Sequence, residues 1–383
     1  MRPDLIARIV NDPFGDPALF LSRRFEKTAF LFDIGDLSLG SRDLLKVTHV
    51  FLSHTHMDHF CGFDRLLRLL LGREKTVAVY GPPGIIQQVG ARLSAYSWNL
   101  VHRYRDVLRF RVTEIGETTS RTHVFSSRLS FKAEEEMRGH AVSGGIRPIL
   151  ETEDLTVTAV PLDHGIPCIA YRVTETARIQ IRPDALARHG YVPGPWLGKL
   201  KQALYAGRPG TDMIQPAGSP GHRAAGETGG HAAAAESPPP CSLGKLRDRL
   251  TKIRPGQSIV YITDLAGTRE NIRRAAALAR NADHLFIEAV FLEADQKHAG
   301  KKHHLTARQA GWIAGASGAK RYTLFHFSAR YEKMNPGREE TQAVFYAEAA
   351  RGVAEGAAKR GRNTGPGGNA APVPCPFSYP AAV

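Results

Sequence analysis

Four side chains able to bind metal ions lie within six residues, in the segment Phe51-Leu-Ser-His54-Thr-His56-Met-Asp58-His59. Imidazole and carboxylate groups suit zinc or a similar first-row ion. The segment contains no thiolate, which favours a hydrolytic over a structural zinc site. Residues i and i+2 share one side of an extended chain, so His54 and His56 should face the same way. The segment predicts a metal centre able to surround two cations.

Two cations need more ligands than this segment supplies, and other candidates follow apolar, strand-like runs further along the chain. His164 comes after residues 155–160, Asp264 after residues 258–263, and His326 after residues 322–325. The carboxyl ends of strands in α/β folds meet where ligands bind. Alone, such a His is usually structural, and Asp264 could be a helix N-cap. Together with the first segment, the three residues indicate one shared site.

The elements that must position these residues alternate between strand and helix. Apolar, β-branched runs at 28–33, 47–53 and 76–80 predict strands, and residues 62–71 and 85–93 have helical apolar spacing. Residues 107–173 are largely β in pattern. Strands are expected again at 258–264, 282–288 and 321–326, with Ala-rich amphipathic helices at 271–280 and 306–315. This alternation predicts a layered α/β domain.

The composition limits the class of protein. The chain has 383 residues, a formal net charge of +14, 16 His and only 4 Cys. The widely spaced cysteines argue against a disulfide scaffold or a thiolate zinc finger, and they favour a reducing cytoplasm. No run approaches the ~20 apolar residues that cross a bilayer, so no membrane association is expected. The basic excess favours a polyanionic partner.

Two stretches have the composition of linkers. Residues 207–240 are rich in Gly, Ala, Pro and Ser, and they are expected to form a disordered low-complexity insert in which His222 and His231 have no role. Residues 351–383 are expected to be a disordered C-terminal tail. The hydrolase domain should therefore occupy residues 1–350.

The first segment resembles the metallo-β-lactamase superfamily, whose HxHxDH signature is matched at positions 54–59. The resemblance implies an αββα sandwich of the metallo-β-lactamase fold, with two mixed β-sheets and outer helices. Later segments are similar to the ribonuclease Z branch, which removes 3′ trailers from precursor tRNA. They are residues 161–172 around His164, 191–201 with Gly194-Pro195, 304–310 and 325–331.

The resemblance implies a role for each matching position. His54, His56 and His164 would hold one Zn²⁺ ion, and Asp58, His59 and His326 the other, with Asp264 bridging the two. Mn²⁺ or another divalent ion could replace zinc. Asp58 would orient or deprotonate the attacking water, and His304 would donate a proton to the leaving ribose oxygen. Glu288 would orient His304; a capping or surface carboxylate is the alternative.

The resemblance also implies an RNA-binding arm and a homodimer. The arm would span residues 172–206, with Gly194, Pro195, Lys199 and Lys201 as the candidate RNA-binding residues. Its cations could neutralise phosphates and its aromatic residues could stack on bases. The alternative is a solvated surface with Trp196 in a core.

The function expected from these features is that of a dinuclear zinc phosphodiesterase acting on precursor tRNA or other RNA. Three departures from the family bear on the substrate. Residues 11–25 lack the family's basic loop, Asp36-Leu-Ser replaces the usual Glu-Gly-Thr, and Asp264 is followed by Leu-Ala-Gly-Thr rather than directly by Thr. One alternative is a hydrolase of the same fold acting on a small phosphodiester, aryl sulfate or ester. Another is a non-catalytic RNA-binding protein with a structural metal site.

Overall fold

The computed structural model describes residues 5–24, 26–116, 118–140, 145–217, 238–332 and 337–363. The chain divides into two compact units. Residues 1–174 and 257–383 contribute to the first unit, and residues 175–256 form the second. Among the described residues, no helix is long and apolar enough to cross a membrane.

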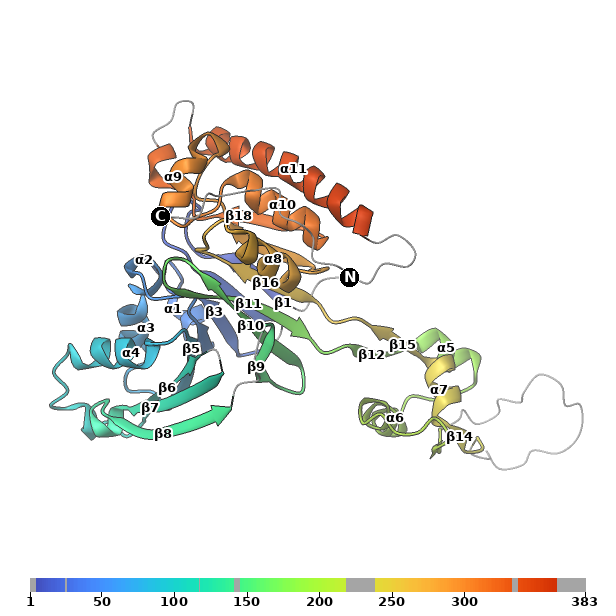
Figure 1. Ribbon diagram of the computed structural model, residues 1–383. Coiled ribbons are helices and arrows are strands. Elements are labelled where there is room, and N and C mark those ends of the chain that lie inside the picture. Colours follow the sequence, from blue (N-terminus) through green and yellow to red (C-terminus); the bar gives the residue numbers. More distant parts are fainter. Residues whose placement is uncertain are drawn as a thin grey trace, which may run out of the picture. The chain divides into compact units, whose positions relative to one another are not determined.

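The first unit contains two β-sheets (Figure 1). Eight strands follow one another across the first sheet, of which β3 to β6 are parallel neighbours. They are β1 (Leu5–Ile9), β2 (Leu19–Arg23), β3 (Ala29–Phe32), β4 (Val47–Phe51), β5 (Lys75–Gly81), β6 (Leu108–Ile115), β7 (Thr119–Ser126) and β8 (Ala133–His140).

The second sheet has the order β18-β17-β16-β11-β10-β9, in which β16, β17 and β18 are parallel and β16 is antiparallel to β11. Its strands are β9 (Arg147–Glu151), β10 (Leu155–Asp163), β11 (Pro167–Glu175), β16 (Ser258–Ile262), β17 (His284–Glu288) and β18 (Tyr322–Phe325). Both sheets are therefore mixed, as predicted.

The two sheets pack face to face through aromatic side chains. Phe32 and Phe51 of the first sheet lie 5.8 Å and 5.4 Å, between ring centroids, from Tyr261 and Tyr171 of the second, respectively. Alternate residues of β3 and β4 point instead to the helices outside, which explains why these strands are apolar on both faces. Burial of these rings, together with the aliphatic side chains of the same cluster, stabilises the contact between the sheets.

Helices cover the outer faces. The helices α1 (Ser41–Leu44), α2 (Met57–Phe60), α3 (Phe63–Leu70) and α4 (Ile85–Ser94) follow strands of the first sheet. The helices α8 (Arg269–Leu278), α9 (Gln296–Lys301), α10 (Ala307–Ser317) and α11 (Arg338–Asn363) belong with the second. Figure 1 shows the helix, sheet, sheet, helix layering. The predicted αββα sandwich is confirmed.

The C-terminal helix corrects one prediction. Residues 351–363 are not part of a disordered tail, because α11 continues to Asn363 and packs along α10. A Cβ added at Gly311 would lie 2.0 Å from the carbonyl oxygen of Ala349, and one at Gly352 would lie 2.0 Å from that of Arg308. The small residues that suggested low complexity therefore allow close backbone contact. The first unit extends at least to residue 363, and residues 364–383 lie outside the described ranges.

The second unit has its own core and corrects the predicted boundaries of the arm. It contains β12 (Arg178–Ile181), α5 (Pro183–Arg188), α6 (Trp196–Tyr205), β13 (Met213–Ile214), β14 (Cys241–Ser242), α7 (Leu243–Leu250) and β15 (Thr251–Arg254). Strand β12 pairs with β15, and β13 with β14. The arm is thus residues 175–256 rather than 172–206, because its closing helix and strand follow the insert. Residues 213–214 are a strand and not part of a disordered insert, while 218–237, with His222 and His231, lie outside the described residues.

Candidate metal centre

The candidate ligands lie where buried strands of both sheets end. His54 follows β4, Asp264 follows β16 and His326 follows β18. The backbone φ angles of Asp264 and His326 are 50° and 60°, and Asp33, after β3, has a φ of 53°. Non-glycine residues adopt this left-handed conformation at an energetic cost, and such residues cluster at functional sites. The strand ends therefore converge on a locally strained site.

One group of ligand atoms comprises His54, His56, His164 and Asp264, whose candidate atoms all lie within 4.8 Å of one another. Nε2 of His164 lies 3.4 Å and Nε2 of His54 lies 3.6 Å from Oδ2 of Asp264. Three imidazoles and a carboxylate are a donor set that suits a tetrahedral zinc ion.

A second group comprises Asp58, His59 and His326, again within 4.8 Å. Oδ2 of Asp58 lies 3.4 Å from Nε2 of both His59 and His326. Oδ2 of Asp264 lies 3.3 Å from Nε2 of His59, and Oδ1 lies 3.0 Å from Nδ1 of His326. Asp264 is therefore adjacent to both groups, which is the position expected of a bridging ligand.

Two buried ring nitrogens show that the donors fit a metal. Nε2 of His54 and Nε2 of His59 have no hydrogen-bond partner among the described residues, although both rings are fully buried. Leaving a buried polar atom unpaired is costly, and a cation in each ligand group would satisfy these two nitrogens, His54 in the first group and His59 in the second. Burial, followed by the neighbouring His59 ring, lowers the pKa of His54 to about 2, so this ring is neutral and available as a ligand.

Carboxylates dominate the charge at the second group. Burial lowers the pKa of His326, but the negative charges of Asp264 and Asp58 outweigh it and raise the pKa to about 10. Burial also opposes ionisation of Asp58, yet its contacts with His326 and His59 hold the pKa of its carboxyl well below the usual range. An ionised carboxylate pair of this kind favours a cation between the rings.

The other nitrogens of the ligand rings are held by groups that sequence reasoning did not assign. Nδ1 of His164 donates to the backbone carbonyl of His303 at 2.9 Å. Asp33 accepts hydrogen bonds from Nδ1 of His59, the backbone and hydroxyl of Ser53, and the hydroxyl of Tyr261 at 2.7–2.9 Å. Such contacts fix the tautomer and direction of a metal-ligating ring. The position of Asp33, a carboxylate at the end of an apolar strand, could have marked it as a site residue in the sequence. Nothing in the sequence marks the contacts of Tyr261 or of the His303 carbonyl.

The expected acid and its partner are also brought together. Nδ1 of His304 lies 2.9 Å from Oε2 of the fully buried Glu288, whose Oε1 accepts a hydrogen bond from the backbone N–H of Leu265. The His304 ring centroid lies 4.9 Å from that of His164 and 5.7 Å from that of His326. Burial lowers the pKa of His304, but the Glu288 charge outweighs it and raises the pKa above the ordinary value. His304 is therefore able to carry a proton beside both ligand groups.

A 370 Å³ cavity opens beside His304 and His326. Its walls include the aromatic rings of Phe14 and Phe327 and the cationic side chains of Lys302 and Arg330. The ring centroids of the two phenylalanines are 5.3 Å apart in an edge-to-face arrangement. An apolar wall beside cations offers places for a base and a phosphate.

The proposed RNA-contacting residues lie in the second unit. Gly194 and Pro195 precede α6, and Lys199 and Lys201 are on that helix, Lys199 being exposed. Trp196 is buried and donates from its indole N–H to the carbonyl of Val192 at 2.9 Å, so it belongs to the core of this unit. Trp196 therefore lies in a core, as the alternative interpretation of this region predicts. Lys199 is exposed and Lys201 is partly exposed.

The sequence and the fold of this chain are similar to those of known proteins. A family described as "Beta-lactamase superfamily domain" matches residues 36–194. The chain is 31% identical to the ribonuclease Z of Deinococcus radiodurans over 335 residues, covering 86% of this chain and 92% of that protein. It is 29% identical to the ribonuclease Z of Thermobifida fusca over 332 residues, covering 85% and 81%. The crystal structure of the short form of human tRNase Z is similar with a TM-score of 0.47 and 18% identity, over 82% of this chain and 87% of that chain.

Proposed function

The chain belongs to the ribonuclease Z family of the metallo-β-lactamase superfamily, and we propose that it is an endoribonuclease that removes 3′ trailers from precursor tRNA. The observation that carries the proposal is Asp264, which lies within 3.6 Å of ring nitrogens from both ligand groups. This arrangement suits two divalent cations held side by side. Zinc is the ion proposed, since three imidazoles and a carboxylate form the first group.

A bound pair of divalent cations supplies activation of water at neutral pH and charge to offset that on the phosphoryl oxygens. The chain's own residues would transfer the protons and position the reacting groups. Asp58, whose side chain is 42% exposed, faces the open side of the centre and would accept a proton from the attacking water. As the bond from phosphorus to the ribose oxygen breaks, His304 would give its proton to that oxygen. Glu288 would hold the His304 ring in place.

Two places on the chain are proposed to bind RNA. Beside the centre, Lys302 and Arg330 would contact a phosphate next to the scissile bond, with Phe14 against a base. In the second unit, Lys199 and Lys201 of α6 and the exposed Lys245 and Arg249 of α7 would hold the body of the tRNA. The α7 residues extend the arm predicted from residues 172–206.

The family resemblance and the cysteines bear on assembly and compartment. We propose a homodimer, as the family resemblance implies, in which the arm of one subunit holds RNA for the centre of the other. The described cysteines Cys61, Cys168 and Cys241 are all free, which supports a reducing compartment such as the cytoplasm.

The experiment that tests the function uses a precursor tRNA transcript with a 3′ trailer. We expect metal-dependent cleavage near the 3′ end of the mature sequence and its loss when a chelator is added. If the transcript stays intact while a nitrophenyl phosphodiester is hydrolysed, the enzyme acts on small substrates instead. If neither is cleaved while RNA and metal both bind, the protein is a non-catalytic RNA-binding protein.

A further inference from the structure

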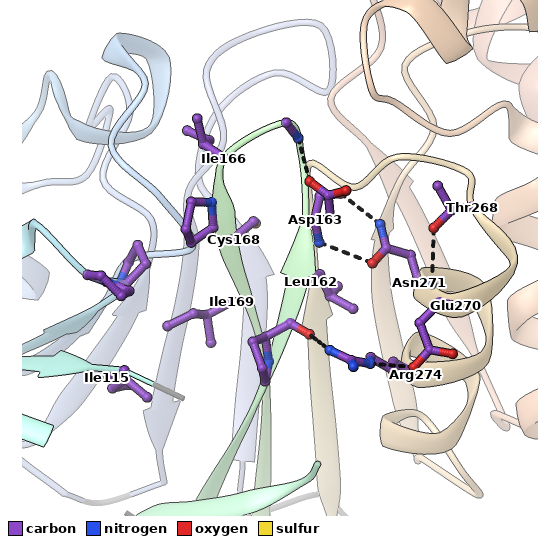
Figure 2. Close-up of a pocket in the computed structure, with 16 residues that line it drawn as sticks. Ile115, Leu162, Asp163, Ile166, Cys168, Ile169, Thr268, Glu270, Asn271 and Arg274 are labelled. Carbon is purple, nitrogen blue, oxygen red and sulfur yellow. Dashed lines mark hydrogen bonds and ion pairs between the residues drawn. The ribbon is translucent and has the colours of Figure 1, made fainter. Parts of the chain in front are cut away.

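Asn271, on the first turn of α8, makes three side-chain hydrogen bonds: two to Asp163 at the end of β10, which Figure 2 shows, and one to the loop after β16. Its Oδ1 accepts from the backbone N–H of Asp163 at 3.0 Å, and its Nδ2 donates to the carbonyl of Asp163 at 2.7 Å. The same Nδ2 donates to the carbonyl of Ala266 at 2.9 Å. The residue is 3% exposed, so these bonds are sheltered from water.

Both contacted segments lead to loops that carry proposed metal ligands. Asp163 directly precedes His164, and Ala266 is the second residue after Asp264. The loops also meet directly, since the backbone N–H of Ala266 donates to the carbonyl of Asp163 at 2.8 Å. The Asn271 side chain therefore closes a bond network that spans the loops of His164 and Asp264.

We propose that Asn271 is a positioning residue that sets the separation of His164 and Asp264, and so the metal affinity of the centre. The inference rests on the proposed function, because it assumes that these two residues bind metal. Their ligand atoms, Nε2 and Oδ2, lie 3.4 Å apart, and a small shift of either loop changes that distance.

The chemistry of the amide explains why asparagine occupies this position. Asp163 presents both a donor and an acceptor, and a side-chain amide is the group that pairs with both at once. Capping of α8 does not need the Asn271 side chain, because the hydroxyl of Thr268 accepts from the Asn271 backbone N–H. The three bonds therefore act on the ligand loops and not on the start of the helix.

Arg274 offers a matched control on the same helix. Its guanidinium donates to the carbonyl of Pro161 at 3.2 Å, which also ties α8 to β10 but reaches neither His164 nor the loop after Asp264. Figure 2 shows Arg274 one turn beyond Asn271. An Arg274→Met variant removes this contact and the ion pair with Glu270 on the same helix, but no hydrogen bond to Asp163 or Ala266.

The test measures cobalt and zinc affinity by competition with a chromophoric chelator, and unfolding in excess chelator, for the full chain and three variants. Asn271→Leu should weaken metal affinity about tenfold or more and alter the visible absorption of bound Co²⁺. Arg274→Met should bind metal as the parent does, even where both variants lose similar stability. Asn271→Ser, a milder change, serves if Asn271→Leu does not fold, and it should also weaken binding.

Parent-like metal affinity in a folded Asn271 variant would overturn the inference, since the residue would then be only structural. A parent protein that binds no metal would instead overturn the proposed function. The two failures are distinguished by the parent measurement alone.

Discussion

Oδ2 of Asp33 lies 2.9 Å from Nδ1 of His59, and both side chains are fully buried. The contact directs the opposite nitrogen, Nε2, toward Asp58 and Asp264. A carboxylate behind a ring in this way fixes the tautomer that presents a lone pair to a metal. Asp33 also accepts a hydrogen bond from the backbone N–H of Ser53. One carboxylate therefore holds both the His59 ring and the end of the strand before it.

Asp33→Asn should therefore weaken metal binding and stability together. The substitution preserves shape but replaces an acceptor oxygen with a donor facing groups that already donate. We expect a loss of ~1–3 kcal/mol in the free energy of unfolding and a lower metal content in the purified protein. Urea denaturation and elemental analysis measure both. The exposed Asp36 gives a control, since Asp36→Asn should change neither.

His304→Ala should reduce turnover while leaving metal content nearly unchanged. The ring is held by Glu288 rather than by the metal ligands, so its loss removes a proton donor worth about 10²–10⁴-fold in rate. Single-turnover cleavage and elemental analysis are compared with those of His123→Ala, a histidine on β7. Loss of metal from the His304 variant would show that His304 is a ligand, as its place in a third group with Asp264, Glu288 and His326 allows.

The buried His49 should make the free energy of unfolding fall at acid pH. Burial, followed by the charges of Arg111 and Lys75, lowers the pKa of His49 from 6.5 to about 4. The unfolded chain thus takes up this proton before the folded protein does. The stability contribution is fully present above pH 6.5 and is lost as the pH falls from 6.5 through 4, by up to ~3 kcal/mol.

His49→Phe should flatten this part of the profile. Urea unfolding in excess chelator at pH 7 and pH 4.5 measures the change. His102→Phe, at an exposed position, is the control. An equal acid-induced loss of stability in the parent and in His49→Phe would contradict the assignment.

The contact between α10 and α11 predicts a sharp difference between glycines. Gly311→Ala places a Cβ 2.0 Å from the carbonyl oxygen of Ala349 and should cost ~1–3 kcal/mol of stability or more. A Cβ at Gly361, in α11, meets nothing within 4 Å, so Gly361→Ala should stabilise the helix slightly, by ~0.5–1 kcal/mol. Equal effects in urea denaturation would contradict this packing.

The two ends of the second unit lie close enough for a short linker to replace it. The chain enters it at Glu175 and leaves it at Gly256, where a Cβ would lie 1.8 Å from the Glu175 carbonyl oxygen, so the two ends are in contact. Replacing residues 177–254 with a short Gly-Ser linker should preserve hydrolysis of a nitrophenyl phosphodiester and reduce cleavage of precursor tRNA about tenfold or more. Lys199→Glu with Lys201→Glu should give a smaller loss that grows with salt. Unchanged tRNA cleavage by the deletion variant would contradict the role of the arm.

The placement of His54, His164, Asp264 and His326 could be predicted, because apolar runs mark buried strands and a polar residue after each marks the strand end. The contacts of Tyr261 and His303 could not, since they depend on how the sheets and loops pack in space. Residues 351–363 of α11 were predicted to be a tail because this part of the helix contacts α10 through small residues such as Gly352 and Gly356. The predicted arm ended too early in the sequence because its closing strand, β15, is far in sequence from its partner, β12.

The proposed reaction requires a two-metal centre bridged by Asp264. Elemental analysis of the purified protein, repeated on Asp264→Ala, tests it most directly. We expect about two divalent ions per chain in the parent and a clear fall below two in the variant. One ion or none in an active parent protein, or an unchanged ratio in Asp264→Ala, would contradict the account.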